Sequence, residues 1–255
     1  AGIRAVLVGG ALLLGAPSWV LFGLIAVPFV LAWGLGWLFL RNQVRGRFVL
    51  DEPPRRMLGF TAHTVGAAAG MGLMITGLPV LIQATSGQPA AQTAALIFAI
   101  TVTRAPIVVP LQALQSFLVA RLRDGDDLAT RRVLALIGGG LVAAGVLGLA
   151  GAWLGPLIIA WLTSGRYDLT SLSLGIIVAS AALVGLLTVT GSALLAARRH
   201  GAYVLGWLLA AAATVLLLIT PLPFDTRFAL ALLLAPALGL VVHATALLRA
   251  HSSAA

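Results

Sequence analysis

The chain has 255 residues, of which 60% are hydrophobic and only 9% are charged, and its mean hydropathy is +1.08. This composition excludes a soluble globular protein and predicts an all-α integral membrane protein. The net charge of +9 comes from sixteen arginines and no lysine, but no basic stretch is long enough to predict binding of nucleic acid. The absence of cysteine excludes disulfides and thiolate metal sites.

The apolar runs predict about eight transmembrane helices, of which the first is truncated. Residues 3–16 would cover only about 21 Å of a hydrocarbon core of about 30 Å. We therefore expect this segment to be the end of a helix and the sequence to be a fragment of a longer protein. Residues 18–40 form the second predicted span. The polar stretch 41–56, RNQVRGRFVLDEPPRR, contains five arginines and a Pro-Pro pair and is predicted to be a basic cytoplasmic linker.

Six more spans are predicted to form one helical lobe over residues 57–249, followed by a tail at 250–255. Their expected ranges are 57–84, 92–121, 131–155 (ended by Gly155-Pro156), 170–197, 201–220 and 226–249. Thirteen of the sixteen arginines lie on one side of this layout, and the opposite side holds Arg166 and Arg227. Because cytoplasmic loops are enriched in basic residues, both termini and the linker are predicted to face the cytoplasm.

The span 92–121 carries an arginine, Arg104, near its middle. A charge at bilayer depth costs several kcal/mol, so it must face protein, water or a ligand. On a helical projection Thr101, Arg104, Gln112 and Gln115 fall within about 80°, and Pro106 and Pro110 leave backbone carbonyls free beside them. This pattern predicts a polar, substrate-binding seam in a broken helix. The alternative is a structural arginine that donates hydrogen bonds to carbonyls of neighbouring helices.

The preceding span contains a fifth candidate for substrate binding, His63. It shares one narrow helix face with four glycines: Gly59, Gly66, Gly70 and Gly77. Small residues at this spacing favour close packing against another helix over a groove that lines a substrate path. Pro79 is expected to leave the carbonyl of Ile75 without a donor and to kink this helix.

Groups that carry out catalysis are missing from the predicted spans. All seven acidic residues lie in predicted loops, and no paired acid and base, P-loop or dinucleotide fingerprint is visible. We therefore expect no catalytic residue, no metal site, no cofactor and no enzymatic activity. A permanently charged, planar guanidinium in an apolar cavity instead suits an anionic ligand such as a phosphate or pyrophosphate.

Three stretches resemble a known family of transporters. Residues 100–126, ITVTRAPIVVPLQALQSFLVARLRDGD, are similar to a second-lobe helix with an Arg-x-Pro core in polysaccharide transporters of the multidrug/oligosaccharidyl-lipid/polysaccharide superfamily. Residues 161–168, WLTSGRYD, resemble an outer-surface loop of these transporters. Residues 194–207, LLAARRHGAYVLGW, resemble the basic turn that joins two of their late helices. The resemblance covers residues 41–255, with residues 1–40 as the end of the first lobe.

The resemblance implies a two-lobed, alternating-access flippase. Its substrate would be an undecaprenyl-pyrophosphate-linked oligosaccharide, or a similar anionic lipid-linked glycan, which it moves across the bacterial cytoplasmic (inner) membrane. In this family cationic residues of the central cavity contact the anionic lipid head, and Arg104 is the matching position. The implied partners are membrane lipid, the glycan substrate and the N-terminal lobe of the same protein. Most of that lobe is missing from the chain, which would therefore contain only half of the cavity.

Other functions remain open on the sequence alone. Another multi-span exporter, of drugs or metabolites, is one alternative; a cation-driven exporter would be expected to carry a buried acid, in this chain or in the missing lobe. A membrane enzyme of envelope polysaccharide assembly would need a pocket with paired acid and base groups. A non-transporting scaffold for that assembly would have no cavity, and its arginine would be enclosed by helices.

Overall fold

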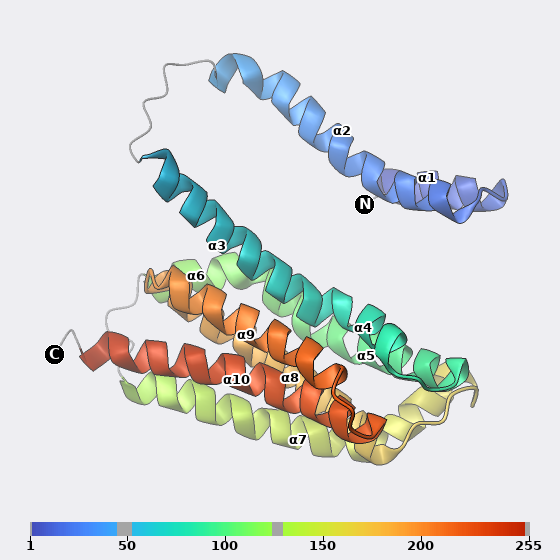
Figure 1. Cartoon of the computed structure of the whole chain (residues 1–255). Coiled ribbons are helices and arrows are strands. Elements are labelled where there is room, and N and C mark those ends of the chain that lie inside the picture. The colour runs from blue at the N-terminus through green and yellow to red at the C-terminus, as the bar shows by residue number, and fades with distance from the viewer. Residues whose placement is uncertain (1, 45–52, 124–129, 253–255) are drawn as a thin grey trace. The chain divides into compact units, whose positions relative to one another are not determined.

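The computed structural model describes residues 2–44, 53–123 and 130–252, and all regular structure in these ranges is helical (Figure 1). The chain divides into two compact units, Ala1–Pro54 and Arg55–Ala255. The predicted linker therefore falls at the boundary between two units, although residues 45–52 lie outside the described part.

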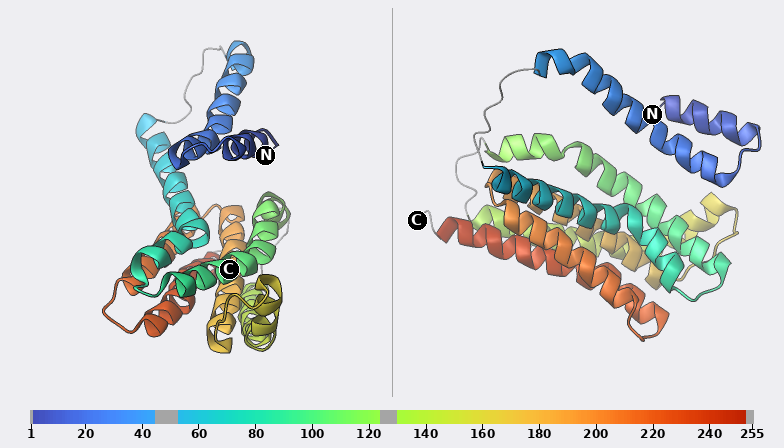
Figure 2. Two further views of the ribbon diagram at one scale, coloured as in Figure 1. Left: turned by 90° about the vertical axis from the view of Figure 1, so that its right-hand side faces the viewer. Right: turned by 45° about the horizontal axis from the view of Figure 1, so that its top comes forward.

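The first unit contains two contacting helices, α1 (Gly2–Leu13) and α2 (Ser18–Val44) (Figure 2). In the turn between them Gly15 has a φ of +66°, a left-handed conformation that glycine adopts without steric cost. α1 has 12 residues, fewer than the roughly 20 that a membrane span needs. Both helices match the predicted segments at the start of the chain.

The second unit contains the helices that form the candidate site. Their bounds are α3 (Pro54–Gly72), the π-helix η1 (Leu73–Gly77), α4 (Leu78–Thr85), α5 (Ala90–Ala113), α6 (Gln115–Arg123), α7 (Thr130–Thr163), α8 (Ser171–Ala196), α9 (His200–Leu218) and α10 (Phe224–Ser252).

Six helices in the described residues are long and apolar enough to cross a membrane. They are Met57–Thr85, Ala90–Ala113, Ala135–Thr163, Ser171–Ala196, His200–Leu218 and Phe224–Arg249. The predicted six spans of the second lobe are thereby confirmed as apolar helices of sufficient length. The total of about eight spans and the side on which each terminus lies stay predictions.

Prolines act differently in three of these helices. α7 continues through Pro156 to Thr163, so the predicted break at Gly155-Pro156 is wrong. Pro156 removes one backbone hydrogen-bond donor, and a membrane helix can tolerate this single loss. The span from residue 92 is broken as predicted, because α5 ends at Ala113 and α6 starts at Gln115. Upstream of Pro79 the helix changes to the π-helical turn η1.

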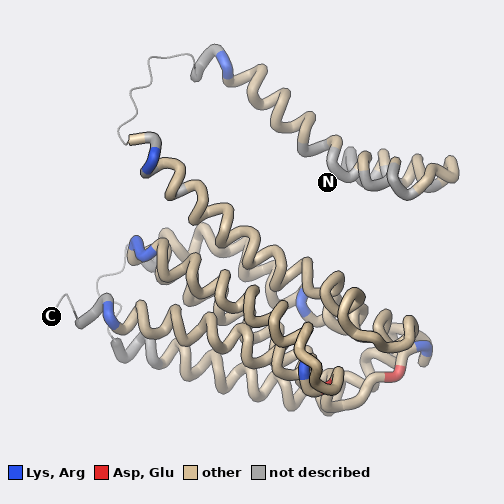
Figure 3. The backbone as a smooth tube through the Cα atoms, viewed as in Figure 1, with Lys and Arg blue, Asp and Glu red and all other residues tan. Residues whose placement is uncertain are grey.

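α8 is the central helix of the second unit and contacts α5, α6, α7, α9 and α10. Glycines allow the close approach of α7 and α8: a Cβ atom on Gly175 would lie 2.9 Å from the carbonyl oxygen of Gly148. Such close contacts between small residues are the usual means by which helices pack in lipid. Charged residues of this unit gather near the helix ends, with Arg104 in α5 as an exception (Figure 3).

Candidate functional site

Arg104 lies in the buried face of α5 with only 4% of its surface exposed. Its Nη1 atom donates a hydrogen bond to the backbone carbonyl of Met74 in η1. Its Nε atom is buried and has no hydrogen-bond partner among the described residues. No ion pair is recorded for the arginine in that part of the chain either, so its charge is balanced there by a carbonyl dipole and not by an acid.

The carbonyl of Met74 is available because of local helix geometry. In a π-helix the carbonyl of residue i accepts from the N–H of residue i+5, so η1 pairs the Leu73 carbonyl with the Leu78 N–H. The next donor in this register would be Pro79, which has no N–H. The sequence analysis predicted that Pro79 leaves a backbone carbonyl free, but it named the carbonyl of Ile75. The π-helical register moves the acceptor that Arg104 uses to Met74.

A cavity of about 300 Å³ adjoins the arginine between η1, α4 and α5. The polar residues of its lining are Arg104, Thr76 and Thr101. Both hydroxyls donate within their own helices, to the carbonyls of Gly72 and Ile97, each at 2.8 Å. Arg104 is therefore the charged residue of this lining.

A larger cavity of about 740 Å³ shares Thr101 with the first one and extends toward the α4–α5 loop. Its polar lining is uncharged and consists of amides and hydroxyls: Gln83, Ser86, Gln88, Thr93 and Thr101. The Ser86 and Thr93 hydroxyls lie 3.1 Å apart. A cationic cavity thus adjoins a neutral one that offers many hydrogen-bonding groups, and we call the two together the Thr101 site.

The remaining predicted residues lie outside the Thr101 site. Gln112 is half-buried, and its Nε2 atom lies 3.4 Å from the Met71 sulfur on α3. Gln115 and His63 line a separate cavity of about 440 Å³ together with Tyr203. The five candidates therefore do not converge on one ligand position.

The glycine face of α3 and η1 packs against α9, as the sequence favoured. A Cβ atom on Gly70 would lie 2.9 Å from the carbonyl oxygen of Trp207, and one on Gly66 would lie 3.6 Å from Leu208. At Gly59 no atom lies within 4 Å. Close helix packing is thus confirmed for the middle of this face.

A buried polar cluster around His243 was missed by the sequence analysis. His243 in α10 is fully buried, and its Nδ1 lies 3.0 Å from the Thr190 hydroxyl of α8. Its Nε2 lies 3.3 Å from the carbonyl oxygen of Tyr203 in α9. A histidine within an apolar run was the signal in the sequence, but its partners come from two other helices. The cluster links three helices.

The six apolar helices, with buried polar groups paired between them, are the features of a multi-pass membrane protein. The chain is 39% identical over 203 residues to an uncharacterized protein of Mycobacterium tuberculosis. The matched region covers 74% of this chain and 44% of that protein. The chain is 36% identical over 248 residues to an uncharacterized protein of Mycobacterium bovis, and that match covers 88% and 56% respectively. The chain spans about half the length of the curated relatives it matches. No family model and no solved structure matches it.

Proposed function

We propose that the chain is part of a membrane flippase for a lipid-linked anionic glycan, such as an undecaprenyl-pyrophosphate-linked oligosaccharide. One observation carries this proposal: the Arg104 cavity adjoins, through Thr101, a larger cavity lined by neutral hydrogen-bonding groups. A pyrophosphate-linked glycan has the same division into an anionic head and an uncharged polyol.

The chemistry of the two cavities supports this orientation of the ligand. A guanidinium has five N–H donors, and the single bond to Met74 leaves others for phosphate oxygens. Charge-assisted hydrogen bonds from arginine to phosphate are strong and directional. The amides of Gln83 and Gln88 and nearby hydroxyls can donate to sugar hydroxyls and also accept from them.

The resemblance to polysaccharide transporters supplies the remainder of the proposal. Two helical lobes would alternate their access around a ligand at mid-membrane, in the bacterial inner membrane, with both chain termini in the cytoplasm. The partner of the second unit would be the first lobe of the same protein. The chain itself would act without a cofactor and would not be an enzyme.

A transport assay in proteoliposomes tests the proposal. The complete protein that carries this sequence is reconstituted with a fluorescent undecaprenyl-pyrophosphate oligosaccharide, and loss of fluorescence to an impermeant quencher reports translocation. We expect translocation by the wild type, none by Arg104→Gln and partial activity in Arg104→Lys, which keeps the charge but loses the planar fork. The 255-residue chain alone is expected to insert without transporting.

Arg166→Gln serves as the matched control, because Arg166 is an exposed arginine in the loop between α7 and α8. We expect it to transport at the wild-type rate. Melting temperatures of all variants separate loss of binding from loss of folding. A folded Arg104→Gln variant that transports normally would rule out a charged ligand contact at this position.

The bond to Met74 favours a second candidate, a non-transporting scaffold of envelope polysaccharide assembly in which Arg104 only joins η1 to α5. Glutamine can still donate to the carbonyl. The scaffold reading therefore predicts that Arg104→Gln and Arg104→Lys both stay folded and functional, whereas an apolar replacement is unstable. A drug or metabolite exporter would instead transport substrates whether or not they carry a pyrophosphate group.

A further inference from the structure

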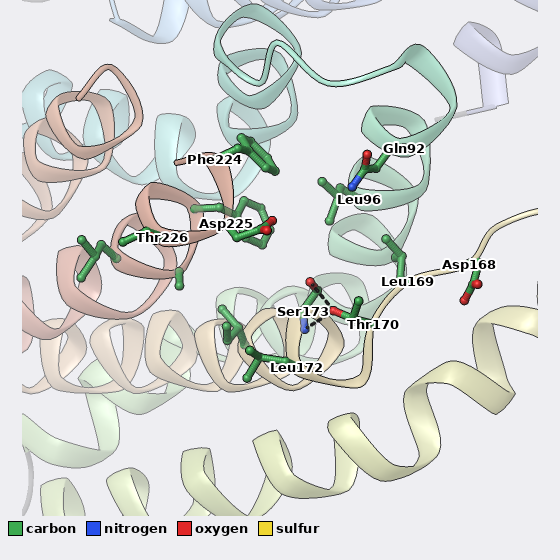
Figure 4. Close-up of a pocket in the computed structure, with 14 residues that line it drawn as sticks. Gln92, Leu96, Asp168, Leu169, Thr170, Leu172, Ser173, Phe224, Asp225 and Thr226 are labelled. Atoms are coloured by element: carbon green, nitrogen blue, oxygen red, sulfur yellow. Dashed lines mark hydrogen bonds between the residues drawn. The ribbon is translucent and has the colours of Figure 1, made fainter. Parts of the chain in front are cut away.

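A third cavity, of about 660 Å³, lies on the other side of the α5 N-terminus from the Thr101 site, between the first turns of α5, α8 and α10 (Figure 4). We call it the Asp225 cavity. Its volume falls within the range of about 300–1,000 Å³ that is common for small-molecule sites. Its walls come from helices that begin at three separate points in the sequence, so the fold alone brings them together.

Polar side chains from each of these helices face the interior of the Asp225 cavity. Figure 4 shows Gln92 of α5, Ser173 of α8 and Asp225 of α10 around a common space, with Asp168 at its edge. In the described part of the chain no side-chain hydrogen bond or ion pair is recorded for Gln92, Asp168 or Asp225. Their amide and carboxylate groups are thus free to bind a ligand.

Two further polar groups of the cavity are held in place by the α8 cap. Thr170 is the N-cap residue of α8, and its hydroxyl accepts from the Ser173 backbone N–H at 3.2 Å. The two hydroxyls, of Thr170 and Ser173, lie 2.8 Å apart. This pair presents oxygen atoms at a fixed position in the lining that also contains Asp225.

The opposite wall is apolar and belongs to the protein core. Leu96, Phe224 and Phe228 are buried, and the two phenylalanine rings contact each other with their centroids 5.4 Å apart. The lining therefore offers apolar surface as well as hydrogen-bonding groups.

The charge of the lining limits which ligands fit. Two carboxylates and no arginine line the cavity. The neighbouring Arg227 donates to the carbonyls of Thr85, Ser86 and Leu218, and its guanidinium carbon lies 5.6 Å from the centroid of the Phe224 ring. Anions such as pyrophosphate are repelled by such a lining, whereas ligands with hydroxyl or amino donors are favoured.

We propose that the Asp225 cavity binds a carbohydrate whose ring carries hydroxyl or amino donors. A pyranose matches the cavity because its edge bears polar groups and its faces bear C–H groups that can pack against the phenylalanine wall. An amino sugar binds most tightly, because its ammonium group can form a charge-assisted hydrogen bond with the Asp225 carboxylate. This site is distinct from the Thr101 site and does not depend on the proposed function.

Protection of a single cysteine tests the proposal, and the chain has no native cysteine to interfere. Thr226→Cys places a thiol in the lining of the cavity, and Ser171→Cys places one on the exposed first turn of α8, outside the lining. The complete chain in nanodiscs is labelled with a maleimide in the presence of methyl glucosaminide. At ten times its Kd the sugar should slow labelling at position 226 about tenfold and leave position 171 unchanged.

Matched variants identify the groups that bind the sugar. Asp225→Asn should remove most of the preference for methyl glucosaminide over methyl glucoside. Ser173→Ala should weaken protection, and Ser171→Ala, two residues away and outside the lining, should not. Saturation-transfer NMR with the cysteine-free chain gives a second measure of sugar binding that does not depend on thiol reactivity.

Two results would overturn the inference. The first is absence of both protection and saturation transfer with either glycoside. The second is equal protection by tetramethylammonium, which carries a charge but no donor and would indicate a general cation site. Because these probes contain no lipid or phosphate, failure here leaves the transport assay for the Thr101 site unaffected.

Discussion

Arg104 in α5 donates a hydrogen bond to the backbone carbonyl of Met74 in η1, although thirty residues separate the two in the sequence. Pro79 removes the donor that a continued π-helical register would supply to that carbonyl. The arginine thus replaces a backbone donor, and the carbonyl dipole in turn stabilises a buried cation. A helix defect and an intramembrane charge, each costly alone, compensate for each other.

This relationship predicts energetic coupling between Arg104 and Pro79. Arg104→Met leaves the Met74 carbonyl unpaired, at a cost of about 1–3 kcal/mol, partly offset by removal of a buried charge. Pro79→Ala restores an N–H and should reduce that cost. Unfolding free energies of the two single variants and the double variant should therefore differ from additivity by at least about 0.5 kcal/mol. For Arg166→Met combined with Pro79→Ala, the changes in unfolding free energy should be additive. If the changes for Arg104→Met and Pro79→Ala are also additive, the two residues do not compensate for each other.

A second prediction concerns the contact between Gly206 and His243. A Cβ atom at position 206 would lie 2.3 Å from the His243 ring, so Gly206→Ala forces a displacement that typically costs about 1–3 kcal/mol. Gly201→Ala in the same helix is the control, because nothing lies within 4 Å of that position. It should be neutral or stabilising by up to about 1 kcal/mol. Thermal unfolding measures both.

The same contact can be tested by rescue. In a His243→Ala background the ring is removed and the Gly239 carbonyl oxygen, 3.2 Å from that Cβ position, is the nearest remaining atom, so Gly206→Ala should cost less. If Gly206→Ala is as harmless as Gly201→Ala in the wild type, α9 and α10 do not approach as closely as described.

Arg227 is expected to stabilise one end of the helical unit. Its guanidinium donates to the Thr85 carbonyl at 2.7 Å and to the Leu218 carbonyl at 3.0 Å, and so joins the C-terminal ends of α4 and α9 to α10. Arg227→Ala leaves these carbonyls unpaired, and we expect a loss of stability of about 2–4 kcal/mol. Arg227→Lys should lose less because it retains a charged donor.

Hydrogen exchange gives the local readout for Arg227. Amides near Leu218 and in the α4–α5 loop should exchange faster in Arg227→Ala than in the wild type. Arg166→Ala should change neither exchange nor melting temperature. Unaltered exchange in Arg227→Ala would show that the three helix ends are held by other contacts.

Membrane topology provides a fourth prediction. Single cysteines at Gln88 and Thr226 should react with an impermeant thiol reagent in intact cells, because both loops lie opposite the arginine-rich side. Cysteines at Gly125 and His200 should react only after the membrane is opened. Labelling of His200 from outside, with no labelling of Gln88, would reverse the predicted orientation. If Gly125 and His200 react from opposite sides of the membrane, the predicted number of spans is wrong.

The sequence by itself determined the class of the protein and most of its helices. Long apolar runs and their arginine-rich ends are properties of single segments, because the cost of burying a polar group in lipid is decided residue by residue. The same reasoning identified Arg104 as a buried cation, the break after Pro110, and the close packing of Gly70. Each of these follows from spacing within one helix.

Only the tertiary structure decided which groups meet. The partner of Arg104 depends on where α5 crosses η1 and on a π-helical register, and neither is encoded in helical periodicity. The separation of Gln115 and His63 from Arg104, the burial of His243 among three helices and the Asp225 cavity likewise arise from contacts across the bundle. The physical reason is that pairing of polar groups between helices depends on the axial shift and rotation of whole helices, which are set by the packing of many small residues together.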